Sequence, residues 1–237
     1  MVAVSDEVAP PSGQVIDCLN AREATEPIKS RGISCDLGLL PFRRMSEPHE
    51  FWRVFIAIEL PLEIRKRITE HIDLLRHEFF DVRASWNREA NLHLSLKFLG
   101  NIPVANIGVL SNATAVAVRT VNPFGLIISG CGVFPAHGRP NVLWIGIDDP
   151  SQNLRRLYAT LEDRCAEAGF EREARAYHPH LTIARMRSPR GARDLAQRHK
   201  EMDFSPVTFT VSELVIFRSE LRSEGSLHTA ISRHDLR

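Results

Sequence analysis

Two short stretches of this chain carry the same four-residue pattern, NLHLSLKFLG at residues 91–100 and HPHLTIARM at residues 178–186. The first contains His93-Leu94-Ser95-Leu96 and the second contains His180-Leu181-Thr182-Ile183, so both tetrads read histidine, leucine, hydroxyl, aliphatic. In a strand, residues i and i+2 point to the same face. Each tetrad is therefore predicted to present an imidazole beside a hydroxyl, while its aliphatic side chains anchor the strand in the core.

The first stretch alternates between apolar and polar residues, which is typical of a strand with one buried face. Its buried face is predicted to carry Leu92, Leu94, Leu96 and Phe98, and its polar face His93, Ser95 and Lys97. Similar elements flank the two tetrads, which indicates a diverged duplication. Two such strands meeting across a pseudo-two-fold axis would line one cleft with two histidines and two hydroxyls.

The rest of the pattern predicts an α+β fold with mainly antiparallel strands, because hairpin-joined strands are interrupted by single helices. The predicted strands lie at residues 53–58, 91–99, 125–129, 141–147, 180–186, 207–217 and 228–231. The predicted helices, each with apolar residues at helical spacing, lie at residues 61–79, 103–118 and 150–169. A loop is expected at residues 130–140.

The chain has 237 residues, of which 43% are hydrophobic and 25% are charged. This composition excludes a wholly disordered or collagen-like protein. The formal net charge of +1 excludes nucleic-acid binding driven by bulk charge alone. Positive charge is concentrated after the second tetrad, in Arg185, Arg187, Arg190, Arg193, Arg198 and Lys200, opposed only by Asp194. This run is either a solvated face or a surface that holds a phosphodiester chain.

Residues 1–50 are predicted to be a disordered N-terminal extension, and residues 51–237 to form the folded domain. The extension holds five of the 14 prolines and no sustained period; translation that begins at Met45 is an alternative explanation. No basic, apolar leader opens the chain, and no apolar run approaches the ~20 residues of a membrane helix. With no C-x-x-C pair among the four cysteines, the sequence predicts a reduced, cytoplasmic protein that does not enter membranes.

The paired histidines and hydroxyls suit in-line displacement at phosphorus. Two imidazoles with an unperturbed pKa near ~6.5 can serve as one acid and one base near neutral pH, and the hydroxyls can donate to phosphate oxygens. Proton transfer then takes the place of metal activation, so neither a metal nor another cofactor is expected. The sequence has no glycine-rich nucleotide-binding motif. A zinc site on His93, His178 and His180 is the chemical alternative.

The chain resembles the 2H phosphoesterases, which are defined by two His-x-Thr/Ser-hydrophobic tetrads, and most of all the RNA 2′,3′-cyclic phosphodiesterases, also called 2′-5′ RNA ligases. The resemblance covers residues 52–237. It rests on RVFIAIELP at 53–61, EANLHLSLKFLG at 89–100, GCGVFP at 130–135, NVLWIGI at 141–147, HPHLTIAR at 178–185 and ELVIFRSELRSEG at 213–225. It implies two lobes, each a mainly antiparallel sheet with outer helices, that face each other across a cleft.

The resemblance also implies roles for the tetrad residues. His93 would be the general acid that protonates the departing 3′ oxygen, and His180 the general base that activates water. Ser95 and Thr182 would bind the phosphate. The partner would be RNA with a 2′,3′-cyclic phosphate end and the product a 2′-phosphate. Run in reverse, the same site would form a 2′-5′ linkage, and the enzyme is expected to act as a monomer without an obligate protein partner.

Phe98 and Arg185 each stand five residues after a tetrad histidine, and both are candidate substrate-binding residues. Phe98 could stack on the terminal base, as aromatic residues do in single-stranded RNA sites, or pack in the core. Arg185 could contact phosphate or backbone, or form a surface ion pair. Strict alternation puts both on the face opposite their histidine, unless a strand end or a bulge turns them.

Several positions depart from the family pattern. Ser95 replaces a threonine, and Ile183 replaces a leucine. Leu227-His228 stands where a tyrosine is usual, and His178 and His228 are expected to be structural or surface groups. Two other functions are compatible with the sequence. One is a phosphodiesterase that acts on small cyclic nucleotides, and the other is an RNA-binding module on the same fold that does not catalyse.

Overall fold

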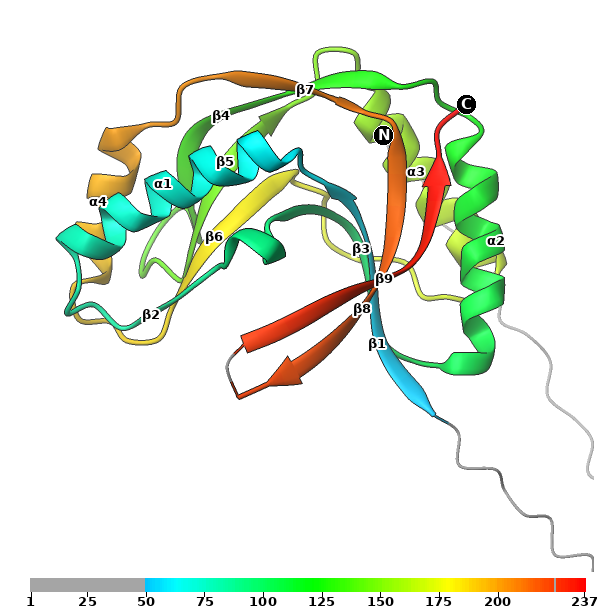
Figure 1. The fold of residues 1–237 in the computed structure, drawn as a ribbon, viewed down its shortest axis with the longest axis horizontal. Coiled ribbons are helices and arrows are strands. Elements are labelled where there is room, and N and C mark those ends of the chain that lie inside the picture. Colours follow the sequence, from blue (N-terminus) through cyan, green and yellow to red (C-terminus); the bar gives the residue numbers. More distant parts are fainter. Residues whose placement is uncertain (1–49, 224) are drawn as a thin grey trace, which may run out of the picture. The chain divides into compact units, whose positions relative to one another are not determined.

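The computed structural model describes residues 50–223 and 225–237. The predicted disorder of residues 1–50 and the alternative start at Met45 lie, apart from residue 50, outside this part. The elements follow the order β1 (Phe51–Glu59), α1 (Leu62–Glu78), β2 (Ala84–Trp86), η1 (Glu89–Asn91), β3 (His93–Pro103), η2 (Val104–Asn106), α2 (Ile107–Val118), β4 (Phe124–Phe134), β5 (Val142–Asp148), α3 (Asn153–Glu167), β6 (His180–Met186), α4 (Ala192–Met202), β7 (Val207–Val211), β8 (Glu213–Arg222) and β9 (Gly225–Asp235) (Figure 1).

These strands form two antiparallel sheets, which confirms the predicted α+β fold. The first sheet has the strand order β3-β1-β8-β9, and the second has the order β2-β6-β5-β4-β7. Every strand pair in both sheets is antiparallel. The first tetrad opens β3 and the second opens β6, so each sheet carries one tetrad.

The two halves repeat a strand–helix–strand unit, β1-α1-β3 and β5-α3-β6, but exchange their helices. Helix α1 packs with α4 against the second sheet, whereas α3 packs with α2 against the first (Figure 1). Side-chain contacts fix this arrangement: His71 of α1 meets His199 of α4, and Glu162 of α3 meets Lys97 of β3. Each sheet is therefore covered by a helix that lies, along the chain, between two strands of the other sheet, although β2 of the second sheet intervenes between α1 and β3.

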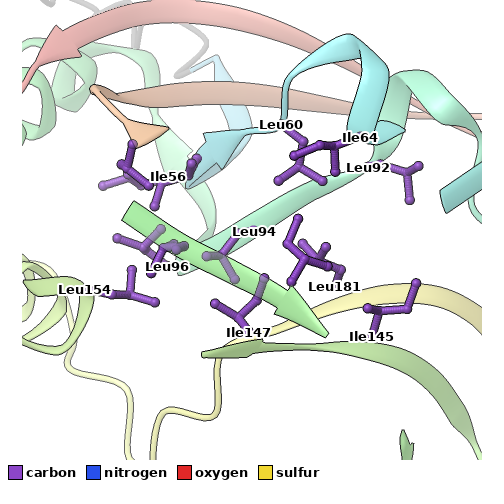
Figure 2. Close-up of a cluster of buried hydrophobic side chains, with 14 of the residues drawn as sticks. Ile56, Leu60, Ile64, Leu92, Leu94, Leu96, Ile145, Ile147, Leu154 and Leu181 are labelled. Atoms are coloured by element: carbon purple, nitrogen blue, oxygen red, sulfur yellow. The ribbon is translucent and has the colours of Figure 1, made fainter. Parts of the chain in front are cut away.

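A single hydrophobic core joins both sheets and the helices behind them. Figure 2 shows side chains of the first sheet, such as Ile56 and Leu94, beside Ile145 and Leu181 of the second. Leu94 and Leu181 are the second residues of the two tetrads, and both are almost fully buried. Burying a leucine side chain contributes roughly 1.5–3 kcal/mol, so the tetrad strands are anchored from behind.

The chain passes from one sheet to the other at Ser212, which corrects the prediction of one strand over residues 207–217. β7 pairs with β4 in the second sheet, and β8 pairs with β1 and β9 in the first. The predicted loop at residues 130–140 is also partly wrong. β4 continues to Phe134 because Gly130, at φ +67°, lets the strand shift its register between Ser129 and Cys131 instead of ending.

Helix α4 and the short strand β2 were not predicted. In α4 the buried positions are Ala192, Leu195, Ala196 and His199, and only one of these is a large aliphatic residue. The basic residues between them concealed the helical period. No helix in the described part of the chain combines the length and the apolar character needed to span a membrane.

Candidate active site

Both tetrads line one cleft of about 1180 Å³. The cleft reaches all six residues that the sequence singled out: His93, Ser95, Phe98, His180, Thr182 and Arg185. Strands β3 and β6 approach each other here, although they belong to different sheets. The sequence therefore identified residues that lie around one shared space.

A β-bulge in β3 decides where Phe98 points. Against β1, Ser95 lies opposite Ala57 and Lys97 opposite Ile56, so Leu96 is an extra residue on its strand. The bulge reverses the alternation: Lys97 is 4% exposed and Phe98 is 56% exposed. The predicted faces of Lys97 and Phe98 are therefore wrong, and the exposure of Phe98 excludes core packing.

The same bulge occurs in β6, at the same place in the tetrad. Thr182 lies opposite Trp144 and Ala184 opposite Leu143, so Ile183 is the extra residue. Ala184 is buried, whereas Arg185 is exposed and lines the cleft. The duplication thus repeats an irregularity as well as a motif. In both halves, the bulge turns the fifth residue after histidine toward the histidine's face.

Each tetrad strand is held by a residue that precedes the other tetrad. Asn87 Nδ2 donates to the carbonyl oxygen of Thr182 at 2.6 Å, and the Asn87 backbone nitrogen donates to the carbonyl of Ile183 at 2.8 Å. Reciprocally, the Tyr177 hydroxyl donates to the carbonyl oxygen of Ser95 at 3.2 Å. These bonds tie the backbones of both hydroxyl residues to the opposite half, which fixes the two tetrads relative to each other.

His93 lies in an aromatic pocket on the cleft face of the first sheet. Its ring stacks on Phe55 at 4.7 Å between centroids, and His228 meets it edge-on at 5.2 Å. The pKa of His93 is lowered to about 4, chiefly by burial and also by the positive charge of His228, and a backbone hydrogen bond with Asn91 acts in the opposite direction. The unliganded site therefore favours a neutral His93 imidazole.

His180 is oriented by a backbone carbonyl two residues earlier. Its Nδ1 lies 2.7 Å from the carbonyl oxygen of His178. Because a carbonyl can only accept, Nδ1 carries the proton and Nε2 of the neutral ring has a free lone pair. Phe134 meets the ring edge-on at 5.0 Å, and burial lowers the pKa of His180. The ring is thus prepared to accept a proton at Nε2.

Trp144 lies close to His180 because Gly132 leaves room for its indole. The ring centroids of Trp144 and His180 are 6.4 Å apart. A Cβ on Gly132 would lie 2.1 Å from the Trp144 ring, so no other residue fits at this position of β4 without displacing the indole. The glycine is therefore part of the support of the second histidine.

Three histidines that the sequence offered as a zinc site do not form one. Among the residues that the structure describes, the only group whose ligand atoms come together is His71, Cys131 and His199, away from the cleft. His180 Nδ1 is already bonded to the His178 carbonyl. His93, His178 and His180 therefore do not bring three ligand atoms together for joint coordination.

Arginines surround the tetrads, and sequence reasoning identified only part of them. From the predicted basic run, Arg185 and Arg187 line the cleft, whereas Arg198 pairs with Glu78 at 2.9 Å on an exposed surface. The remaining arginines of the lining come from separated parts of the chain: Arg53, Arg76, Arg88 and Arg222. No local motif joins these positions, so only the fold reveals them.

His228, expected to be structural or on the surface, also lines the cleft. It lies on β9 and packs edge-on against Phe55 at 4.9 Å. Its buried Nδ1 has no hydrogen-bond partner in the described part of the chain. One signal in the sequence marked this position, because His228 stands where the family usually has a tyrosine. In the structure this changed residue lies on β9 and faces His93.

Comparison with known proteins agrees with this geometry. A family model described as the 2′-5′ RNA ligase superfamily matches residues 61–222. The chain is 32% identical to the RNA 2′,3′-cyclic phosphodiesterase of Methanothermobacter thermautotrophicus, over 75% of this chain and 95% of that protein. It is 30% identical to the protein of the same name from Thermotoga maritima, over 76% of this chain and 92% of the relative.

Solved structures give the same assignment. The crystal structure of TT0787 of Thermus thermophilus aligns with a TM-score of 0.64 and 25% identity, covering 78% of this chain and 98% of that one. The structure of Escherichia coli LigT complexed with 3′-AMP aligns with a TM-score of 0.59 and 26% identity, covering 79% and 99%. By sequence and by fold, this chain belongs to the 2′-5′ RNA ligase superfamily.

Proposed function

We propose that this protein hydrolyses RNA ends that carry a 2′,3′-cyclic phosphate, giving a 2′-phosphate and a free 3′ hydroxyl. One observation carries the proposal: His93 with Ser95 and His180 with Thr182 line the same cleft, each pair on one face of its strand. The relatives named RNA 2′,3′-cyclic phosphodiesterase support the choice of substrate.

The reaction needs two proton transfers on opposite sides of one phosphorus. His180 Nε2 takes a proton from water as the water oxygen bonds to phosphorus, and His93 gives a proton to the 3′ oxygen as the P–O3′ bond breaks. The Ser95 and Thr182 hydroxyls donate to the non-bridging oxygens and hold the phosphorus in line. None of these steps uses a metal ion. Release of the product and exchange with solvent return both histidines to their starting states.

Substrate binding supplies the condition under which His93 can act as an acid. Burial lowers the pKa of His93 to about 4, so the empty cleft holds a neutral ring near pH 7. The phosphodiester brings a negative charge beside the imidazole, which favours the protonated form. The acid is thus charged chiefly when there is a leaving group to protonate.

Phe98 and Arg185 complete the substrate site. Arg53 lies over one face of the Phe98 ring at 4.8 Å from its centroid, and Phe98 remains 56% exposed. An unpaired base can stack on the exposed part of the ring. Arg185 lines the same cleft from β6 and offers a cation to the phosphate or the next backbone unit.

The same residues would also join two RNA ends. With a 5′ hydroxyl in place of water, His180 takes the proton of that hydroxyl and His93 again protonates the 3′ oxygen, so the cyclic phosphate is opened to a 2′-5′ linkage. Cleavage of that linkage back to the cyclic phosphate would use the two histidines with their roles exchanged. Water is in large excess, so hydrolysis is the expected net direction. The proposal includes a monomeric enzyme in the reducing cytoplasm, where the free thiols of Cys131 and Cys165 would stay reduced.

The test is product analysis with matched histidine variants. The protein is incubated with an oligoribonucleotide ending in a 2′,3′-cyclic phosphate and, separately, with small 2′,3′-cyclic nucleotides. His93→Ala and His180→Ala should each lose about 10²–10⁴-fold in rate, and His77→Ala, an exposed histidine at the end of α1, should remain at the rate of the unaltered protein.

Three outcomes would change the proposal. A cyclic-nucleotide rate that exceeds the RNA rate assigns the site to small substrates. RNA binding without a phosphomonoester product makes the chain a binding module. Near-normal activity of either tetrad variant removes the two-histidine mechanism.

A further inference from the structure

We propose that His71, Cys131 and His199 form a binding site for one zinc ion on the helix-covered side of the second sheet, separate from the catalytic cleft. The three residues come from α1, β4 and α4, and their ligand atoms lie within 4.8 Å of one another. None of them lines the cleft. The site plays no part in the chemistry proposed above, so each proposal can fail without the other.

The distances suit a tetrahedral ion. His71 Nε2 and His199 Nδ1 are 3.0 Å apart, and Cys131 Sγ is 3.8 Å from His71 Nε2. A zinc ion with Zn–N bonds of about 2.0–2.1 Å and a Zn–S bond of about 2.3 Å separates its ligand atoms by roughly 3.3–3.6 Å. Shifts of a few tenths of an ångström accommodate the two separations from His71. The third pair, Cys131 Sγ and His199 Nδ1, lies within 4.8 Å and must close to the same range, and one coordination position remains for a fourth ligand.

His199 already has the orientation of a metal ligand. Its Nε2 lies 3.0 Å from the carbonyl oxygen of Trp144 and must donate to it, so the lone pair of the neutral ring is on Nδ1, which faces the other two residues. Metal-bound histidines commonly donate their second nitrogen to a carbonyl in this manner. Burial lowers the pKa of His71 to about 4 and also lowers the pKa of His199, so both rings are neutral near pH 7, as a ligand must be.

The charge balance favours a divalent ion. Without metal, burial raises the pKa of the Cys131 thiol to about 12, so the sulfur carries its proton, and the Nε2 proton of His71 lies between the two rings. When zinc binds, the thiol proton leaves to solvent and His71 changes to the tautomer protonated on Nδ1. The ion and thiolate then carry one net positive charge. Asp203, whose negative charge acts on both His71 and Cys131, offsets it.

A hydrogen-bonded histidine pair would explain His71 and His199 but would leave Cys131 unexplained. The Cys131 thiol approaches His71 Nε2, which is already hydrogen-bonded to His199. Cys131 lies on β4, and β4 approaches α1 and α4 at this point. Two imidazoles and one thiolate are ligands that zinc commonly takes in proteins, and copper(II) is the other common divalent ion that binds such a set. Such an ion would connect α1, α4 and β4, three segments that are far apart in the sequence.

The experiment titrates metal-free protein with Zn²⁺ by calorimetry and with Co²⁺ by absorption spectroscopy. We expect one ion per chain, release of about one proton, the visible bands of tetrahedral cobalt and a sulfur-to-cobalt charge-transfer band. Zn²⁺ should also raise the midpoint of thermal unfolding, since it binds the folded state only. These measurements use the unaltered chain, so they do not depend on whether a variant folds.

Matched variants then identify the ligands. Cys131→Ser should abolish the charge-transfer band and weaken zinc binding roughly 100-fold or more, while Cys165→Ser, at the other free cysteine of the described residues, keeps both. His71→Gln should remove the stoichiometric binding, and His77→Gln, two turns along the same helix, should not. If the unaltered chain binds neither ion at one equivalent, or if Cys131→Ser retains the band, the cluster is a hydrogen-bonded pair beside a thiol and the proposal is wrong.

Discussion

The two tetrad strands are alike where the chemistry needs them and unlike one residue further on. In both β3 and β6 the histidine has a backbone hydrogen bond to the residue two positions earlier, and the fourth tetrad residue is a bulge. After the bulge, β3 continues with Lys97-Phe98 and β6 with Ala184-Arg185. The halves therefore share the geometry of the tetrad and its bulge, and they differ in the residue buried behind the bulge and in the residue exposed beside the cleft.

The buried difference is an ion pair that only the first half contains. Lys97 Nζ lies 2.8 and 2.9 Å from the two carboxylate oxygens of Glu162 and 2.7 Å from the carbonyl oxygen of Glu171. All three donors of the ammonium group are thus satisfied, as a buried lysine requires. The corresponding residue of β6, Ala184, is small and apolar and needs no such partner. The comparison shows that the bulge tolerates very different residues, provided that each is accommodated from behind.

Replacing only one partner of this ion pair should have the largest effect on stability. Lys97→Met leaves the Glu162 carboxylate buried without its cation, which should lower the free energy of unfolding by about 3–5 kcal/mol. Arg172→Met is the control, since it removes an exposed pair with Asp163 on the same helix and should cost less than about 1 kcal/mol. Urea unfolding of the three proteins measures both values. Equal losses would mean that the buried pair is no more important than the exposed one.

The residues that the two strands expose beside the cleft, Phe98 and Arg185, should make two different kinds of contact with the substrate. Phe98→Ala should weaken binding of a cyclic-phosphate oligonucleotide by about 1–3 kcal/mol, the usual range for one stacked base, with little change in salt dependence. Arg185→Gln should weaken binding and also reduce the slope of log affinity against log salt by about one. Fluorescence anisotropy at several salt concentrations distinguishes them. A slope that changes in Phe98→Ala and not in Arg185→Gln would reverse the two assignments.

The smallest expected effect concerns the neighbours of the two catalytic histidines. Above both histidine pKa values, kcat/KM falls about tenfold per pH unit, in proportion to the fraction of the acid that keeps its proton. Burial is the largest cause of the lowered His93 pKa, and the charge of His228 adds to it only where His228 is protonated. Because burial also lowers the pKa of His228, that ring is neutral on the alkaline limb, so His228→Gln should change kcat/KM there by less than about threefold.

The second half supplies the control. The charge of His178 lowers the pKa of His180, but a base with a raised pKa leaves the alkaline limb unchanged. His178→Gln should therefore move only the acidic limb. If His228→Gln moves the acidic limb and His178→Gln does not, the acid and base roles proposed for His93 and His180 are exchanged.

The sequence predicted what depends on residue type and local spacing. Both tetrads, their strands and the shared cleft follow from a pattern four residues long. Phe98 and Arg185 turn toward the cleft because of the register of β3 against β1 and of β6 against β5. The alternation of residues along either strand does not reveal this register. The same holds for Lys97, whose partner Glu162 lies on α3 behind the first sheet. Long-range pairing fixed these features.

The exchange of α1 and α3 between the sheets makes the two halves interdependent in folding. A break in the exposed residues 135–139, between β4 and β5, would leave one fragment with His93 and the other with His180. Each fragment would carry a helix whose apolar face matches strands of the other, and β1 would lack its neighbour β8. Neither fragment holds a complete sheet or cleft, so the hydrolytic site exists only when both are assembled. The two fragments would therefore have to associate to form the cleft, and recovery of hydrolytic activity after mixing them would measure that association.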